Sequence, residues 1–129
     1  MNIINMRPET KKLWNLYLKD LKKYPLEETR YKINDYTVFI RRDQYGGNNG
    51  YIVLPYKHKF EELEDYQIEL NVHGGITYKE EEKCYGWVIG FDTSHVGDFV
   101  PKAINCHGSH FWTHEEVLAE LKKVVEQLY

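Results

Sequence analysis

The sequence predicts a single α+β domain over residues 1–129, with a mainly antiparallel sheet of five or six strands packed against an N-terminal and a C-terminal helix. Three observations lead to this prediction. Apolar residues recur at three- and four-residue steps near both ends of the chain. Between these ends lie short segments rich in β-branched and aromatic residues, separated by Gly, Asn and Asp. A length of 129 residues fits one hydrophobic core.

The first element is an amphipathic helix over residues 8–23. Pro8 suits a first helical turn because its φ is already fixed near the helical value. Pro25 ends the helix, since the residue before a proline is driven out of the α region. The residues that recur at helical spacing and form its apolar stripe are Leu13, Trp14, Tyr17, Leu21 and Tyr24.

The next segments predict strands. Residues 30–35 and 36–42 form a hairpin that turns at Asn34-Asp35. The run GGNNG at 46–50 predicts a turn rather than a phosphate-binding loop, because no Lys-Ser or Lys-Thr follows it. A third strand is expected over 50–55, and the charged segment 59–66 is expected to form a short helix or a loop.

The second half of the sheet follows the same logic. Residues 67–72 alternate apolar and polar side chains, which predicts a strand that ends at the Gly74-Gly75 break. Residues 76–79 and 85–92 predict a last hairpin, and the charged run 80–83 is its exposed end.

The C-terminal helix has the clearest signal. Thr113 and Glu116 form a capping box, in which each side chain satisfies a free backbone N–H of the other residue. The apolar stripe that follows consists of Val117, Leu118, Leu121, Val124, Val125 and Leu128.

Charge and composition argue against several functions. A formal charge of −3 leaves no basic surplus for binding duplex nucleic acid by counterion release. The sequence shows neither an apolar run long enough to span a membrane nor a secretory leader, so we expect a cytoplasmic protein. Cys84 and Cys106 are accordingly expected to be reduced.

Strand alternation places a group of polar side chains. Ile68, Leu70 and Val72 share one face of their predicted strand, so His73 lies on the other face. In the last strand, Trp87, Ile89 and Phe91 share the core face, and Asp92 lies opposite with three other residues: Gly86, Val88 and Gly90. We therefore expect His73 and Asp92 to emerge together on the face away from the helices, with Gly86 and Gly90 as a pocket floor. The alternative is that this face simply meets solvent.

His95 and Asp98 follow the last strand in a glycine-containing loop, where functional residues are common. Histidine is the side chain that exchanges protons near neutral pH, and a carboxylate can hold its ring in one tautomer and orientation. Two histidines and two aspartates thus suit acid–base chemistry. Each of them taken alone is more typical of a surface residue or a turn former.

A rival cluster is offered by Cys106, His107, His110 and His114, whose sulfur and imidazole donors suit zinc. The sequence disfavours this reading, because no second CxxC or HExxH motif accompanies the cluster. No metal or other cofactor is therefore expected.

The blocks "GYIVLPYKHKF", "VHGGITY" and "WVIGFDTSHVGD", with the closing helix, resemble a family of small proteins encoded by phages and prophages. The resemblance covers roughly residues 50–128. It points to these residues: Gly50, Tyr51, Pro55, His58, His73, Gly74, Gly75, Thr77, Tyr78, Asp92, His95, Gly97 and Asp98. Residues 102–112 have no counterpart in it.

By analogy of size and phage context, the resemblance implies a counter-defence protein that acts on a nucleotide signal in the host cytoplasm. Whether it is an enzyme is left open. The leading hypothesis is acid–base cleavage of a phosphodiester in a cyclic dinucleotide. The catalytic residues would be His58, His73, Asp92, His95 and Asp98, and the ligand-binding residues Tyr51, Gly74, Gly75, Thr77, Tyr78 and Gly90.

Two alternatives remain. The same residues could enclose a cyclic nucleotide or an ADP-ribose-derived signal without cleaving it. The chain could instead block a host enzyme by surface contact, for which its tyrosine content is the only indication. A homodimer is compatible with each hypothesis.

Overall fold

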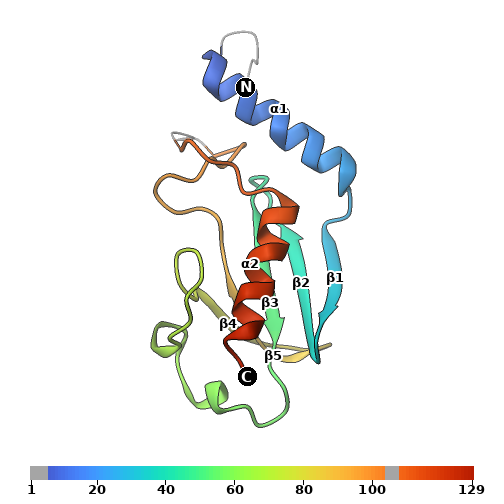
Figure 1. Cartoon of the computed structure of the whole chain (residues 1–129), viewed down its shortest axis with the longest axis vertical. Coiled ribbons are helices and arrows are strands. Elements are labelled where there is room, and N and C mark those ends of the chain that lie inside the picture. Colours follow the sequence, from blue (N-terminus) through green and yellow to red (C-terminus); the bar gives the residue numbers. More distant parts are fainter. Residues whose placement is uncertain (1–5, 104–107) are drawn as a thin grey trace.

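The computed structural model of the chain describes residues 6–103 and 108–129. It confirms an α+β fold with two helices and a five-stranded antiparallel sheet (Figure 1). The strands lie side by side in the order β1-β2-β3-β5-β4. The elements in chain order are α1 (Pro8–Lys23), β1 (Glu28–Ile33), β2 (Tyr36–Arg42), β3 (Asn48–Val53), the 3-10 helices η2 (Lys59–Glu62) and η3 (Asp65–Gln67), β4 (Tyr78–Glu82), β5 (Gly86–Phe91) and α2 (His114–Glu126).

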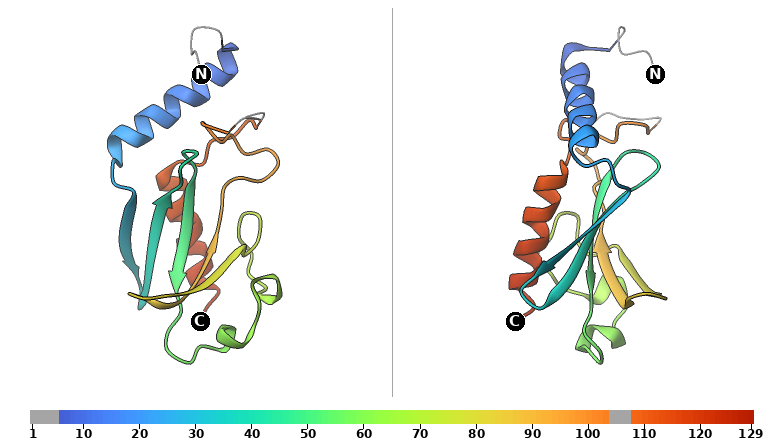
Figure 2. Two further views of the ribbon diagram at one scale, coloured as in Figure 1. Left: turned by 180° about the vertical axis from the view of Figure 1, so that it is seen from behind. Right: turned by 90° about the vertical axis from the view of Figure 1, so that its right-hand side faces the viewer.

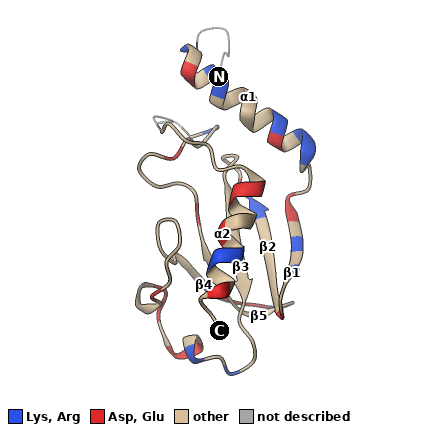
Figure 3. Cartoon of the chain, in the orientation of Figure 1, with Lys and Arg blue, Asp and Glu red and all other residues tan. Residues whose placement is uncertain are grey.

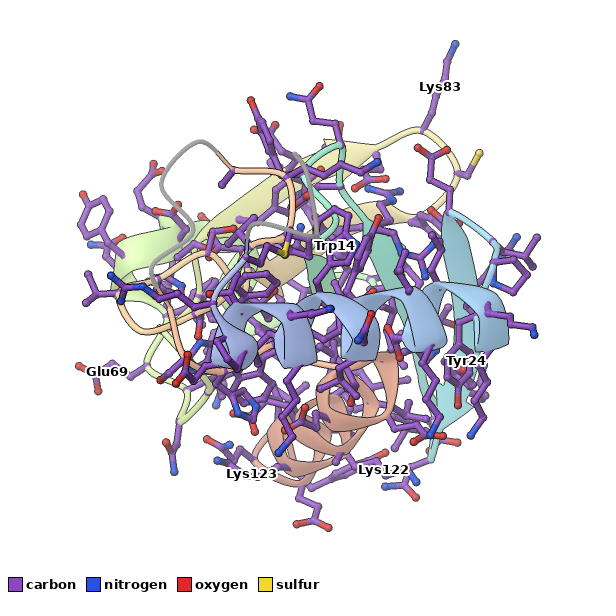
Figure 4. The ribbon with its side chains drawn as sticks, turned by 90° about the horizontal axis from the view of Figure 1, so that it is seen from above. Trp14, Tyr24, Glu69, Lys83, Lys122 and Lys123 are labelled. Atoms are coloured by element: carbon purple, nitrogen blue, oxygen red, sulfur yellow. The ribbon has the colours of Figure 1, made fainter. Side chains whose placement is uncertain are left out.

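The two helices occupy different places on the sheet. Helix α2 runs along one face, and α1 lies across the end of both the sheet and α2 (Figures 1, 2 and 4). The main core forms between α2 and the sheet, and it contains Val117, Leu121, Val124 and Val125 from the helix, as the apolar stripe predicted. A smaller cluster of Tyr17, Phe99 and Phe111 lies beneath α1.

Both helix ends follow the predicted signals. Helix α1 begins at Pro8 and ends at Lys23, two residues before Pro25. At the start of α2, Thr113 Oγ1 accepts a hydrogen bond from Glu116 N at 3.2 Å, and Glu116 Oε1 accepts one from Thr113 N at 3.0 Å. Lys122 and Lys123 point outward from α2, away from the sheet (Figure 4).

A buried carboxylate joins α1 to α2. Asp20 Oδ2 accepts a hydrogen bond from Asn48 Nδ2 at 3.0 Å, and Asp20 Oδ1 accepts one from His114 N at 3.1 Å. The imidazole of His114 is stacked on Tyr24, with ring centroids 3.8 Å apart, and its Nε2 lies 2.7 Å from the hydroxyl of Tyr31. Burial lowers the pKa of His114.

The predicted turn at 46–50 is wrong in its second half. The turn spans 43–47, while Asn48, Asn49 and Gly50 already belong to β3 and are buried. Both asparagine side chains are used by neighbours: Asn49 Oδ1 accepts from Thr93 N at 3.2 Å, and its amide donates to Asp43. Hydrogen bonding within the protein therefore makes the buried Asn49 acceptable in a strand, whereas Asn48 donates through Nδ2 and its Oδ1 is buried without a partner among the described residues.

The predicted strand at 67–72 is also wrong, although its alternation is right. Ile68 and Val72 are buried, yet the segment joins no sheet. Its backbone is held by side chains of the C-terminal segment instead. The side-chain amide of Gln127 accepts from Asn71 N at 2.7 Å and donates to Asn71 O at 2.8 Å, and Glu120 Oε1 accepts from His73 N at 2.8 Å.

On the sheet face away from α2, Gly90 does not form the expected pocket floor, and the face meets solvent at its edges, where Arg30, Lys32 and Glu80 are exposed. Phe39 and Val88 are fully buried on it, and the ring of Tyr51 stacks on Phe39 with centroids 4.9 Å apart. A β-carbon on Gly90 would come within 2.6 Å of Tyr51 Cδ1. The space that Gly90 leaves is therefore filled by an aromatic ring.

Charges of both signs are interspersed along α1 and α2 (Figure 3). Among the residues described, neither helix is both long and apolar enough to cross a bilayer.

Candidate functional site

Two glycine-rich bends bring distant segments together beside α2. The first is the turn at 72–75, in which Gly74 and Gly75 adopt φ values of +70° and +77°. These left-handed conformations are costly for residues with a β-carbon, which explains both glycines. The second is the loop after β5, where Asp98 N donates to His95 O at 2.9 Å and Gly97 has φ +94°. The two bends place His73 next to His95.

His73 is paired with Asp98. The distance from His73 Nε2 to Asp98 Oδ2 is 2.8 Å, and only 4% of the Asp98 side chain is exposed. Asp98 accepts two further hydrogen bonds, from His95 N at 2.9 Å and from Trp112 Nε1 at 3.1 Å. Because an ionised carboxylate only accepts, the Nε2 atom of His73 carries a proton and its Nδ1 is the atom left for other chemistry.

His95 is paired with Asp92. The distance from His95 Nε2 to Asp92 Oδ1 is 2.8 Å, but the ring N–H does not point at this oxygen with hydrogen-bond geometry. The carboxylate is held by Thr77 Oγ1 at 3.1 Å and by Ser94 N at 3.2 Å. Gly74 lies so close to the imidazole of His95 that a β-carbon on Gly74 would be 2.0 Å from His95 Nε2.

The two imidazoles form one small polar surface, which we call the His73–His95 site. Their ring centroids are 5.4 Å apart and their planes are nearly perpendicular. Their side chains are 23% and 31% exposed, so solvent and ligands can reach both. Among the contacts of the described residues, neither Nδ1 atom has a hydrogen-bond partner. Two imidazoles of this kind can accept and donate protons on one bound group.

Two residues of the site were missed by the sequence reasoning. The indole of Trp112 lies against His73 with ring centroids 4.3 Å apart, besides donating to Asp98. Glu120 holds the backbone of His73 from α2. Trp112 lies in the stretch 102–112, which has no counterpart in the resemblance, and Glu120 occupies the polar face of an amphipathic helix, so neither was indicated as a site residue by the sequence.

His58 belongs elsewhere. It caps η2, where its Nδ1 accepts a hydrogen bond from Phe60 N at 3.1 Å. Burial lowers the pKa of His58, which favours the neutral ring that such an acceptor requires. No hydrogen bond or ring contact among the described residues links it to His73 or His95.

The predicted ligand-binding residues are divided between two places. Gly74, Gly75 and Thr77 belong to the His73–His95 site, with Thr77 orienting Asp92. Tyr51, Tyr78 and Gly90 instead lie on the sheet face away from α2. There the ring of Tyr51 meets that of Tyr78 edge to face, with centroids 5.1 Å apart.

Tyr51 and Tyr78 surround a half-buried arginine, and we call this group the Arg41 cluster. Arg41 pairs with Glu82 at 2.7 Å and with Glu28 at 2.7 Å. Its guanidinium carbon lies 5.1 Å from the ring centroid of Tyr51. Burial, together with the hydrogen bond to Glu82, raises the pKa of Tyr78 to about 12, so its hydroxyl stays protonated at neutral pH.

The disfavoured zinc cluster falls partly outside the described residues, where Cys106 and His107 lie. His110 Nε2 lies 2.8 Å from Glu116 Oε2, and His114 Nε2 contacts Tyr31. Within 6–103 and 108–129, no group of three His, Cys, Asp or Glu side chains is arranged to hold a metal ion. Cys84 is a free, exposed thiol.

Comparison with protein-family models, with curated proteins and with solved structures finds no significant match to this chain. Its function is therefore argued from the geometry of the site.

Proposed function

We propose that the protein cleaves a phosphodiester bond in a small nucleotide signal, by acid–base catalysis at the His73–His95 site. The observation that supports this most is the pairing of two neighbouring imidazoles, 5.4 Å apart, each with its own carboxylate. One imidazole takes a proton from the attacking water or ribose hydroxyl. The other donates a proton to the leaving oxygen as the bond from phosphorus to that oxygen breaks.

The carboxylates have a different task. Asp98 holds the His73 ring by a hydrogen bond, as the orienting acid does in other nucleophile–base–acid arrangements, and Asp92 is a negative charge 2.8 Å from His95 Nε2. Asp98, Asp92 and Glu120 also make the surroundings negative. An anionic phosphodiester is attracted only while at least one imidazole is protonated, so cleavage needs one protonated and one neutral ring. The rate should have a bell-shaped dependence on pH.

In the phage setting that the resemblance implies, the substrate class is a cyclic dinucleotide or a related cyclic nucleotide used as a host defence signal. The deciding experiment incubates the purified protein with a panel of cyclic dinucleotides and cyclic ADP-ribose isomers and analyses the products by chromatography and mass spectrometry. Cleavage yields a linear product. Intact nucleotide that is recovered only after heat denaturation indicates sequestration and contradicts cleavage.

Variants locate the activity. His73→Ala and His95→Ala should each lower the rate by about 10²–10⁴-fold, the usual contribution of general acid–base catalysis. His58→Asn is the matched control, because asparagine can also cap η2 and His58 lies outside the site. Full activity in His73→Ala would rule out the proposed site.

A further inference from the structure

The Arg41 cluster shows how this protein binds a guanidinium. Arg41 lies over Phe39, with its guanidinium carbon 4.4 Å from the ring centroid, and over Tyr51. Two carboxylates, Glu28 and Glu82, receive its N–H groups. Aromatic faces combined with a pair of acids suit a planar cation, because the π faces and the carboxylate oxygens are all electron-rich.

A surface recess nearby repeats this composition. It has a volume of about 290 Å³ and is lined by Leu54, Tyr56, Glu61, Glu81, Tyr85, Gly86 and Trp87. We call it the Trp87 recess. Leu54 is buried at its floor, and Gly86 leaves the space open, since a β-carbon there would meet nothing within 4 Å. The recess shares no residue with the His73–His95 site.

The two carboxylates of the recess lack a cation of their own. The described ion pairs of lysine and arginine involve Glu28, Glu82, Glu115 and Glu120. Glu61 and Glu81 take part in none of them. Glu81 directly faces Trp87 across the β4–β5 ladder, next in sequence to the paired Glu82. The carboxylates of Glu61 and Glu81 thus lack, among the described contacts, the ion pair that completes the Arg41 cluster.

Lys79 is the cation at Trp87, and its ammonium is already hydrogen-bonded. Lys57 Nζ lies 5.5 Å from the ring centroid of Tyr56, and the guanidinium carbon of Arg30 lies 5.7 Å from that of Tyr85. Lys79 Nζ lies 4.6 Å from the Trp87 ring centroid and donates to the backbone carbonyls of Glu61 and Leu63. This contact holds η2 beside Trp87, and it shows that the Trp87 ring attracts cations here. Glu61 Oε1 accepts a hydrogen bond from Lys57 N at 2.9 Å, so Glu61 Oε2 and the carboxylate of Glu81 are left for another group.

We propose that the Trp87 recess binds an arginine side chain of a partner protein. A guanidinium can stack on an aromatic ring and form two hydrogen bonds with a carboxylate at once, which a lysine ammonium cannot do. Tyr56 at the rim is 89% exposed. An exposed tyrosine beside a site for one charged anchor is typical of protein interfaces, whose binding energy is concentrated in such anchors. The proposal is independent of the proposed phosphodiester cleavage.

The test is an NMR titration of the isotope-labelled full chain with the peptide acetyl-Gly-Arg-Gly-amide. We expect saturable shifts of the Gly86, Trp87 and Glu81 amides, with a Kd of about 1 mM for this single anchor. The neutral citrulline analogue has nearly the same shape and should cause no saturable shift. Equal binding of the citrulline peptide would overturn the proposal.

Variants give a second test. Glu81→Gln and Tyr56→Ala alter exposed side chains, and each should weaken peptide binding about two- to fivefold. Glu80→Gln is the matched control, because Glu80 is exposed on the same strand but points to the opposite face. Unchanged binding in Glu81→Gln, or tighter binding of free agmatine than of the peptide, would contradict an arginine anchor on a protein.

Discussion

The contact between Gly74 and His95 allows a prediction with an internal control. Gly74 and Gly75 have nearly equal φ values, +70° and +77°, so alanine at either position pays a similar backbone cost of about 1–2 kcal/mol. The two positions differ in the atoms that the β-carbon of an alanine would contact. At Gly75 it meets nothing within 4 Å, whereas at Gly74 it would lie 2.0 Å from His95 Nε2.

The clash at Gly74 has a size that can be worked out. Non-bonded heavy atoms settle at about 3.5 Å, so the His95 ring has to move by roughly 1.5 Å in Gly74→Ala. A displacement of about 1 Å can cost about 10²-fold in rate at a catalytic site. Gly75→Ala should keep most of the activity and lose only stability, while Gly74→Ala should lose the activity as well.

Three measurements compare Gly74→Ala with Gly75→Ala: urea unfolding, the NMR shifts of the His95 ring, and the rate of nucleotide cleavage or binding. The expected result is a similar loss of stability from the backbone in both, with a moved His95 ring and lost activity in Gly74→Ala alone. If the two variants have the same His95 shifts and the same activity, the close approach of Gly74 to His95 does not position the ring.

Three other predictions concern stability. Arg41→Met should lower the free energy of unfolding by about 2 kcal/mol at neutral pH, because it leaves charged hydrogen-bond acceptors without their donor. Hydrogen bonding to Arg41 lowers the pKa of Glu82, so the contribution of this pair to the free energy of unfolding is present above about pH 4.5 and is lost as the pH falls further. Urea unfolding at pH 7 and pH 4 should show that the difference in free energy of unfolding between wild type and Arg41→Met becomes smaller in acid. Burial lowers the pKa of His114, so the unfolded chain takes up a proton at this histidine before the folded chain does. Wild-type stability should therefore fall as the pH drops below about 6.5. His114→Gln should show a smaller fall between pH 7.5 and 5.5. Trp112→Phe keeps a ring beside His73 but removes the N–H that Asp98 accepts, which should cost about 1–2 kcal/mol in urea unfolding; no loss would mean that this hydrogen bond contributes nothing.

The helices and the two hairpins could be predicted because their signals are local. The capping box of Thr113 and Glu116 and the proline boundaries of α1 depend only on residues a few positions apart. The turn at Asn34 likewise follows from its own residue type, since asparagine tolerates the left-handed φ of 54° found there.

The errors come from contacts between distant segments. Alternation at 67–72 identified the inward side chains correctly, but it could not show that Gln127 and Glu120 of the C-terminal segment would replace a neighbouring strand. A glycine within a strand predicts an opening at Gly90, yet the ring of Tyr51 from β3 fills this space. Periodicity shows which way a side chain points and not what it meets.

The sequence located only part of the candidate site, because this site also depends on contacts between distant segments. His73, Asp98, His95 and Asp92 come together as expected, but beside α2 rather than on the opposite face of the sheet. His58 lies apart from them, and Trp112 was missed because its contribution depends on a long-range hydrogen bond.

In the proposed mechanism, His73 and His95 act together on one ligand. The most direct measurement is an NMR titration of both imidazoles with a hydrolysis-resistant phosphorothioate cyclic dinucleotide. The two rings should respond together, with one shared Kd, and Asp98→Asn should weaken both responses. Rings that do not respond, or that respond with unrelated affinities, would contradict this mechanism.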